Sequence, residues 1–108
     1  MSRFADILAR LAATIEARKG ADPSSSYTAK LLAGGPALAA KKMGEEAIET
    51  ALAAALDDPE AVAAESADLI YHWLVLLTAS GVSLDAVAAK LEAREGRSGI
   101  EEKASRKS

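Results

Sequence analysis

The sequence contains no cysteine and very few aromatic residues. Its 108 residues include no Cys, and Phe, Trp and Tyr together account for 4%. The lack of Cys excludes disulfide frameworks and thiolate metal sites, so any bound metal would need oxygen or imidazole ligands. It is also compatible with a reducing compartment, and we expect the chain to be cytoplasmic.

An excess of basic charge and a long hydrophobic run are also missing. The 13 Lys and Arg residues are outnumbered by 16 Asp and Glu residues, which disfavours a nucleic-acid partner because phosphate backbones are bound by clustered basic side chains. The longest apolar run, Leu69–Ala79, is interrupted by His72 and is too short to span a bilayer. The N-terminus shows no basic segment followed by an apolar one, so we expect a soluble, unexported chain without a membrane partner.

The residues that are present predict one all-α domain. Hydrophobic residues make up 50% of the chain and charged residues 27%, which is typical of a globular helical domain rich in Ala and Leu. Apolar spacing, capping residues and Gly or Pro breaks predict five helices, with no strand pattern and no repeat: Ser2 to about Gly20, Tyr27–Ala33, Ala37–Leu56, Pro59–Ser80, and a shorter one after Ser83. We expect residues 1–95 to form the domain and residues 96–108 a polar tail.

Acidic residues recur at helical spacing on the two long segments. Glu45, Glu46 and Glu49 lie on the predicted helix 37–56, and residues three or four apart share a helix face. At about 100° per residue, with Glu46 at 0°, Glu49 lies near 300°. Three large apolar residues of this helix lie at roughly 200° to 280° and are expected to face the core; they are Ile48, Leu52 and Leu56. The acids would then border the core.

A second acidic pair, Glu65 and Asp68, comes directly before the most apolar segment, Leu69–Leu77. A segment that is apolar nearly all round is buried by its neighbours. Partly buried carboxylates that converge from two helices repel each other unless a cation neutralises them. Oxygen ligands alone suit Mg²⁺, with Mn²⁺ as the alternative, and Mg²⁺ commonly completes its shell with water and phosphate oxygens. We therefore expect a phosphate-bearing substrate.

Other interpretations of the same residues stay open. Lys41 and Lys42 could form ordinary salt-bridge ladders with the nearby acids on a solvated face. His72 lies one turn after Asp68 and could bind a metal, orient a ligand or form a hydrogen bond within the core. Tyr71 and Trp73 suit a core or a dimer interface better than a base-binding surface.

Four blocks of the sequence resemble a known family, the phosphoribosyl-ATP pyrophosphohydrolases of histidine biosynthesis. The blocks are Ser26–Leu32, Gly35–Pro36, Lys42–Glu49 and Glu65–His72. The Glu-x-x-Glu and Glu-x-x-Asp pairs alone are shared with the wider superfamily of all-α nucleotide pyrophosphohydrolases, whereas the Ser-Tyr-Thr-Ala-Lys and Lys-Met-Gly-Glu-Glu stretches are similar to this family in particular.

The resemblance implies a fold, a reaction and a site. The fold would be an antiparallel helical bundle completed by homodimerisation. The reaction would be hydrolysis of 1-(5-phosphoribosyl)-ATP to 1-(5-phosphoribosyl)-AMP and pyrophosphate. The metal-binding acids would be Glu46, Glu49, Glu65 and Asp68. Glu45 would act with Glu46 and Glu49 in catalysis, and Lys30 and Lys42 would contact the phosphates.

Two other functions agree with parts of the sequence. The acidic pairs by themselves would equally suit a house-cleaning pyrophosphatase that acts on free nucleoside triphosphates. A helical dimerisation module without enzymatic activity would use the acids as interface or surface residues. Substrate profiling separates the two enzymes, and metal titration tests the third interpretation.

Overall fold

The computed structural model describes residues 2–95, and these residues form five α-helices and no strand. The helices are α1 (Arg3–Ala17), α2 (Tyr27–Ala33), α3 (Gly35–Ala55), α4 (Pro59–Ser80) and α5 (Leu84–Arg94). The predicted all-α class is confirmed, and the helices begin and end within three residues of the predicted positions. The predicted tail, residues 96–108, lies outside the described residues.

Side-chain caps explain where four of the helices begin. The side chains of Ser2, Ser26, Asp58 and Ser83 each accept a hydrogen bond, 3.0 to 3.1 Å long, from the backbone N–H three residues later. Helix α3 has no such cap; it begins at Gly35, whose φ of 78° favours glycine, and continues into Pro36. The starts of the helices are therefore set locally.

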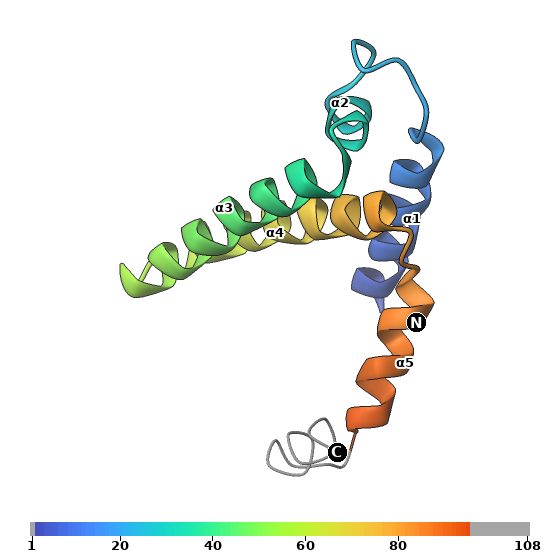
Figure 1. Cartoon of the computed structure of the whole chain (residues 1–108). Helices are drawn as coiled ribbons and strands as arrows, with labels where there is room; N and C mark the ends of the chain where they lie inside the picture. Colours follow the sequence, from blue (N-terminus) through green and yellow to red (C-terminus); the bar gives the residue numbers. More distant parts are fainter. Residues whose placement is uncertain (1, 96–108) are drawn as a thin grey trace, which may run out of the picture.

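Helices α3 and α4 lie side by side as an antiparallel hairpin, and α1 and α2 lie against the end of the hairpin where α4 finishes (Figure 1). The hydrophobic core lies at that end and draws one or more residues from each of these four helices: Ile15, Leu31, Ala39, Leu74 and Val75. The other half of the hairpin, which carries the acidic residues, extends beyond this core.

The prediction that Ile48, Leu52 and Leu56 face the core was wrong. Ile48, Leu52 and Leu56 are 64%, 57% and 79% exposed. The buried positions of α3 are Ala39 and Ala53, which lie on the same face as Glu46 because seven residues make about two turns. Small alanine side chains let α3 approach α4 closely, so Glu46 lies on the inner face and the larger side chains point away.

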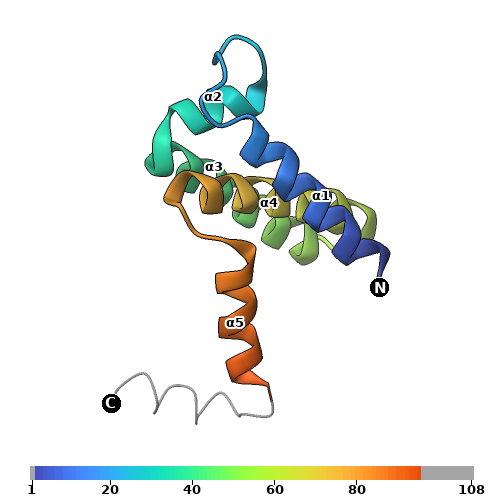
Figure 2. The same cartoon turned by 90° about the vertical axis from the view of Figure 1, so that its right-hand side faces the viewer.

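Helix α5 extends away from the other helices in both views (Figures 1 and 2). It contains no buried residue, although Leu84 packs against the core, and Leu91 is 61% exposed. In residues 2–95 no single helix is long and apolar enough to cross a membrane. Only α4 and α5 taken together reach the required length and apolar composition, and they are bent by 110° relative to each other.

Candidate metal centre

Three of the predicted carboxylates meet between α3 and α4. Glu46 and Glu49 lie one turn apart on α3, and Glu65 comes from the facing helix α4. Each contributes a carboxylate oxygen, and these oxygens all lie within 4.8 Å of one another. The hairpin therefore brings together acids separated by up to 19 positions in the sequence, and we call these three residues the acidic triad.

Two oxygens of the acidic triad have no hydrogen-bond partner. The Oε2 atoms of Glu46 and Glu65 are buried and receive no hydrogen bond from the described residues. A buried carboxylate oxygen without a donor is unfavourable, because it has lost water without gaining a replacement. Either a proton or a cation has to compensate for this. An all-carboxylate donor set suits hard divalent cations such as Mg²⁺ or Mn²⁺, so the residues present fit the predicted metal.

The proximity of the carboxylates also changes their acidity. The pKa of Glu65 is raised to about 7. The largest cause is hydrogen bonding with the neighbouring Glu49 carboxyl; burial and the negative charges of Glu49 and Glu46 add to it. Burial, followed by the hydrogen bonding and charge of Glu49 and the charge of Asp68, raises the pKa of Glu46. Both shifts mean that the triad resists carrying its full negative charge unless a cation is present.

The other predicted site residues are not part of the triad. Asp68 is exposed, one turn after Glu65, and contributes its negative charge to the raised pKa of Glu46. Glu45 is exposed and pairs with Lys42 through an Nζ to Oε1 distance of 3.6 Å. Lys30 is exposed on α2 and forms no ion pair with any residue in 2–95.

His72 forms hydrogen bonds through both ring nitrogens. Its Nδ1 lies 2.8 Å from the main-chain oxygen of Asp68, and its Nε2 lies 3.3 Å from the hydroxyl of Tyr27. The ring is only 7% exposed. Of the alternatives that the sequence left open, the structure shows the hydrogen-bonded core histidine.

Sequence reasoning gave no role to Tyr27 and Thr28. Both residues contact α4: Tyr27 bonds to His72, and Thr28 Oγ1 lies 2.5 Å from the Tyr71 hydroxyl. The rings of Tyr27 and Tyr71 stack with centroids 6.4 Å apart. A signal was present, because two of the four blocks that carry the family resemblance contain these residue pairs at adjacent positions.

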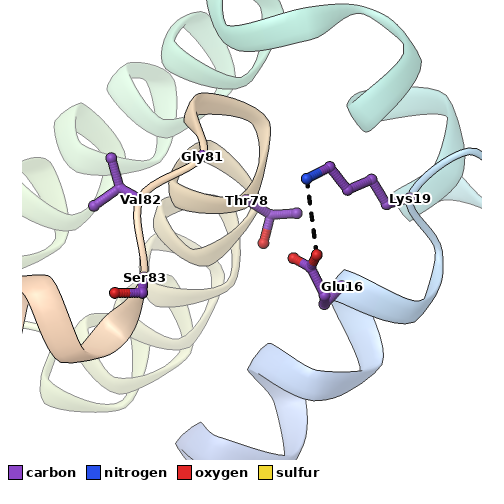
Figure 3. Close-up of a pocket in the computed structure, with 6 residues that line it drawn as sticks. All are labelled: Glu16, Lys19, Thr78, Gly81, Val82 and Ser83. Carbon is purple, nitrogen blue, oxygen red and sulfur yellow. Dashed lines mark ion pairs between the residues drawn. The ribbon is translucent and has the colours of Figure 1, made fainter.

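A separate cavity lies far from these acids, between the end of α1 and the turn from α4 to α5 (Figure 3). Its volume is about 300 Å³ and its lining is Glu16, Lys19, Thr78, Gly81, Val82 and Ser83. Glu16, its one carboxylate, already pairs with Lys19 at 3.7 Å. Thr78 is 13 residues beyond Glu65 on α4, which corresponds to roughly 20 Å along the helix. The cavity therefore does not offer a second metal centre.

Comparison with known proteins agrees with the geometry. The model of the family described as phosphoribosyl-ATP pyrophosphohydrolase matches residues 8–95. A phosphoribosyl-ATP pyrophosphatase of Caulobacter vibrioides (strain NA1000 / CB15N) is 74% identical over 104 residues, which cover 96% of each chain. Proteins of the same name are 68% identical over the full length of both chains in Caulobacter sp. (strain K31), and 60% identical over 93% of this chain and 97% of the relative in Cereibacter sphaeroides (strain ATCC 17029 / ATH 2.4.9).

Proposed function

Because the chain belongs to the phosphoribosyl-ATP pyrophosphohydrolase family, we propose that it hydrolyses 1-(5-phosphoribosyl)-ATP to 1-(5-phosphoribosyl)-AMP and pyrophosphate. This is the second step of histidine biosynthesis. The observation that carries the proposal is the acidic triad, with its two buried and unpartnered oxygens, on the residues that the family resemblance singled out. The cytoplasmic location stays a prediction from the sequence.

The cofactor that we propose is Mg²⁺, with Mn²⁺ as a substitute. Glu46, Glu49 and Glu65 would hold it, and Asp68 would complete the acidic set from the next turn of α4. When bound, the cation lowers the pKa of a water molecule and offsets the charge of the phosphate oxygens. The support is the donor set itself, because the unpartnered oxygens of Glu46 and Glu65 are the groups that a cation would satisfy.

The remaining polar residues would accept the proton of the attacking water and bind the phosphates. Water attacks the α-phosphorus, the bond from this phosphorus to the oxygen bridging to the β-phosphate breaks, and pyrophosphate leaves with that oxygen. Glu45 stands outside the triad and is paired with Lys42, so its carboxylate, which would not hold the metal, would take the proton of the attacking water. Lys30 and Lys42 would bring positive charge to the phosphates, which a chain with a net charge of -3 otherwise repels.

Release of pyrophosphate tests the proposal. The purified chain should hydrolyse phosphoribosyl-ATP in the presence of Mg²⁺ and lose this activity in EDTA. Glu49→Gln should abolish it, whereas Glu16→Gln, which removes an exposed carboxylate remote from the triad, should not. Comparable turnover of common nucleoside triphosphates would favour a house-cleaning pyrophosphatase instead, and no turnover of any nucleotide would favour a binding module.

The working form that we propose is a homodimer, in which α3 and α4 of two chains pack as one antiparallel bundle. The support is the exposed apolar side of α3, formed by Ile48, Leu52 and Leu56, on the half of the hairpin that the core does not cover. An apolar surface of this kind marks an interface more often than a solvated face. A second copy of the hairpin would bury it.

Sedimentation velocity tests the dimer. Wild type should sediment as a dimer, and Leu52→Glu should shift it towards monomer because the new carboxylate would be desolvated in the interface. Ala13→Glu, at an exposed position of α1, is the control and should leave the distribution unchanged. A monomeric wild type at micromolar concentration would contradict this part of the proposal.

A further inference from the structure

Two hydrogen bonds between side chains fasten the start of α2 to the middle of α4. One joins Tyr27 to His72 and the other joins Thr28 to Tyr71. Within residues 2–95 these are the hydrogen bonds that join side chains of different helices. They connect adjacent residues on α2 to adjacent residues on α4, so they fix the rotation of the short helix about its own axis as well as its distance from α4.

The bond through His72 has a definite direction. The oxygen of Asp68 is a main-chain carbonyl, which can only accept, so Nδ1 of His72 carries the hydrogen and donates it. In the neutral ring Nε2 then holds a lone pair, and the hydroxyl of Tyr27 donates to it. The chain of bonds thus runs from Tyr27 to the backbone of Asp68, one turn from Glu65.

Lys30 lies three residues after Tyr27 on the same short helix. Its side chain is exposed and has no ion-pair partner in the described part of the chain, whereas Lys42 is paired with Glu45. The buried residues Ala29 and Leu31 hold α2 against the core but lie on a different face from Lys30. The direction in which Lys30 points therefore depends on the rotation of α2, which these buried residues set together with the two side-chain bonds.

We propose that Tyr27 and His72 are positioning residues, which hold Lys30 where it contacts the phosphates of the substrate beside the acidic triad. This inference rests on the proposed function and assigns the phosphate contact to Lys30. An ammonium group stabilises a phosphate by an interaction that weakens as the distance grows, so a displaced Lys30 would bind the substrate less tightly. The hydroxyl of Tyr27 would act on the substrate only through Lys30.

A double-mutant cycle tests this assignment with phosphoribosyl-ATP and Mg²⁺. Tyr27→Phe keeps the ring and removes only the hydroxyl, and it should raise KM roughly threefold to tenfold, as expected for one hydrogen bond, with kcat within about twofold of wild type. Lys30→Met should raise KM at least as much. In the Lys30→Met background, Tyr27→Phe should change KM less than twofold, because the positioned group is already gone.

The control is Thr14→Val, which also removes a hydroxyl, one that bonds to the Arg10 carbonyl within α1. It should leave KM unchanged. Circular dichroism melts establish that each variant is folded. His72→Asn breaks the bond to Tyr27 from the other side. It should therefore not raise KM further when it is added to Tyr27→Phe.

An active wild type in which Tyr27→Phe raises KM equally in both Lys30 backgrounds would overturn the inference alone, because the bond would then have a merely structural role. A normal KM for Lys30→Met would overturn it as well. A folded wild type that does not turn over phosphoribosyl-ATP would overturn the proposed function and this inference with it, so the two failures are distinguishable.

Discussion

Glu46 of α3 and Glu65 of α4 face each other across the helical hairpin, and each has one buried carboxylate oxygen without a hydrogen-bond partner. Folding by itself does not favour this arrangement, because it removes two acidic groups from water and places them beside Glu49. Side chains that destabilise the folded chain in this way are typical of a functional site, where a bound ligand compensates for the cost of their burial. The first two predictions follow from this.

Mg²⁺ should stabilise the folded chain. At a concentration roughly 100 times its Kd, binding to the folded state alone should raise the melting temperature by about 10 °C. Glu46→Gln should lose most of this rise, whereas Glu16→Gln should keep it. Differential scanning fluorimetry at fixed protein concentration measures both. An equal rise in the two variants would mean that Mg²⁺ binds elsewhere.

The stability of the metal-free protein should fall as the pH rises. The pKa of Glu65 is about 7 in the folded chain against 4.5 for the free side chain, so between these values the folded state binds more protons than the unfolded state. The raised pKa of Glu46 acts in the same direction. The melting temperature in EDTA should therefore decrease from about pH 4.5 to 7.

Glu65→Gln should flatten this decrease and make the metal-free protein more stable than wild type at pH 8, because the variant carries no charge to desolvate. Melting curves in EDTA across this pH range provide the comparison. Parallel profiles for wild type and variant would show that Glu65 titrates normally.

The helices could be predicted from the sequence because their boundaries depend on neighbouring residues. Ser2, Asp58 and Ser83 cap the helices that follow them, and Gly81 ends α4 with a φ of 71°. The inner face of α3 could not be predicted in the same way. Hydropathy selects Leu52, whereas close approach to α4 selects Ala53, and only the packed pair of helices shows which of these decides.

The acidic triad was predictable because acids at helical spacing beside a buried apolar segment need a compensating charge, and a cation supplies it most simply. The bond between Tyr27 and His72 was not predictable, since it joins residues 45 positions apart and depends on how α3 and α4 fold back so that α4 lies beside α2. Periodicity describes one helix at a time and contains no information about such a contact.

Two measurements, the Mg²⁺-induced rise in melting temperature and kcat, should distinguish the role of Glu45 from that of Glu49. Glu45 is exposed and outside the triad, so Glu45→Gln should keep the Mg²⁺-induced rise in melting temperature while kcat falls by about 100-fold, as for the loss of a general base. Glu49→Gln should lose both the rise and the activity. A Glu45→Gln variant with normal kcat would remove Glu45 from the catalytic set.

Two glycine substitutions should change the stability in opposite directions. At Gly81 and Gly44 an added methyl group would meet no atom within 4 Å, so backbone conformation decides each outcome. Gly81 has a φ of 71°, where alanine is strained, and Gly81→Ala should lower the free energy of unfolding by about 1 to 2 kcal/mol. Gly44 lies inside α3, and Gly44→Ala should raise it by about 1 kcal/mol because alanine favours the helix. Urea denaturation at one protein concentration measures both, and a change of the same sign at the two positions would contradict the backbone explanation.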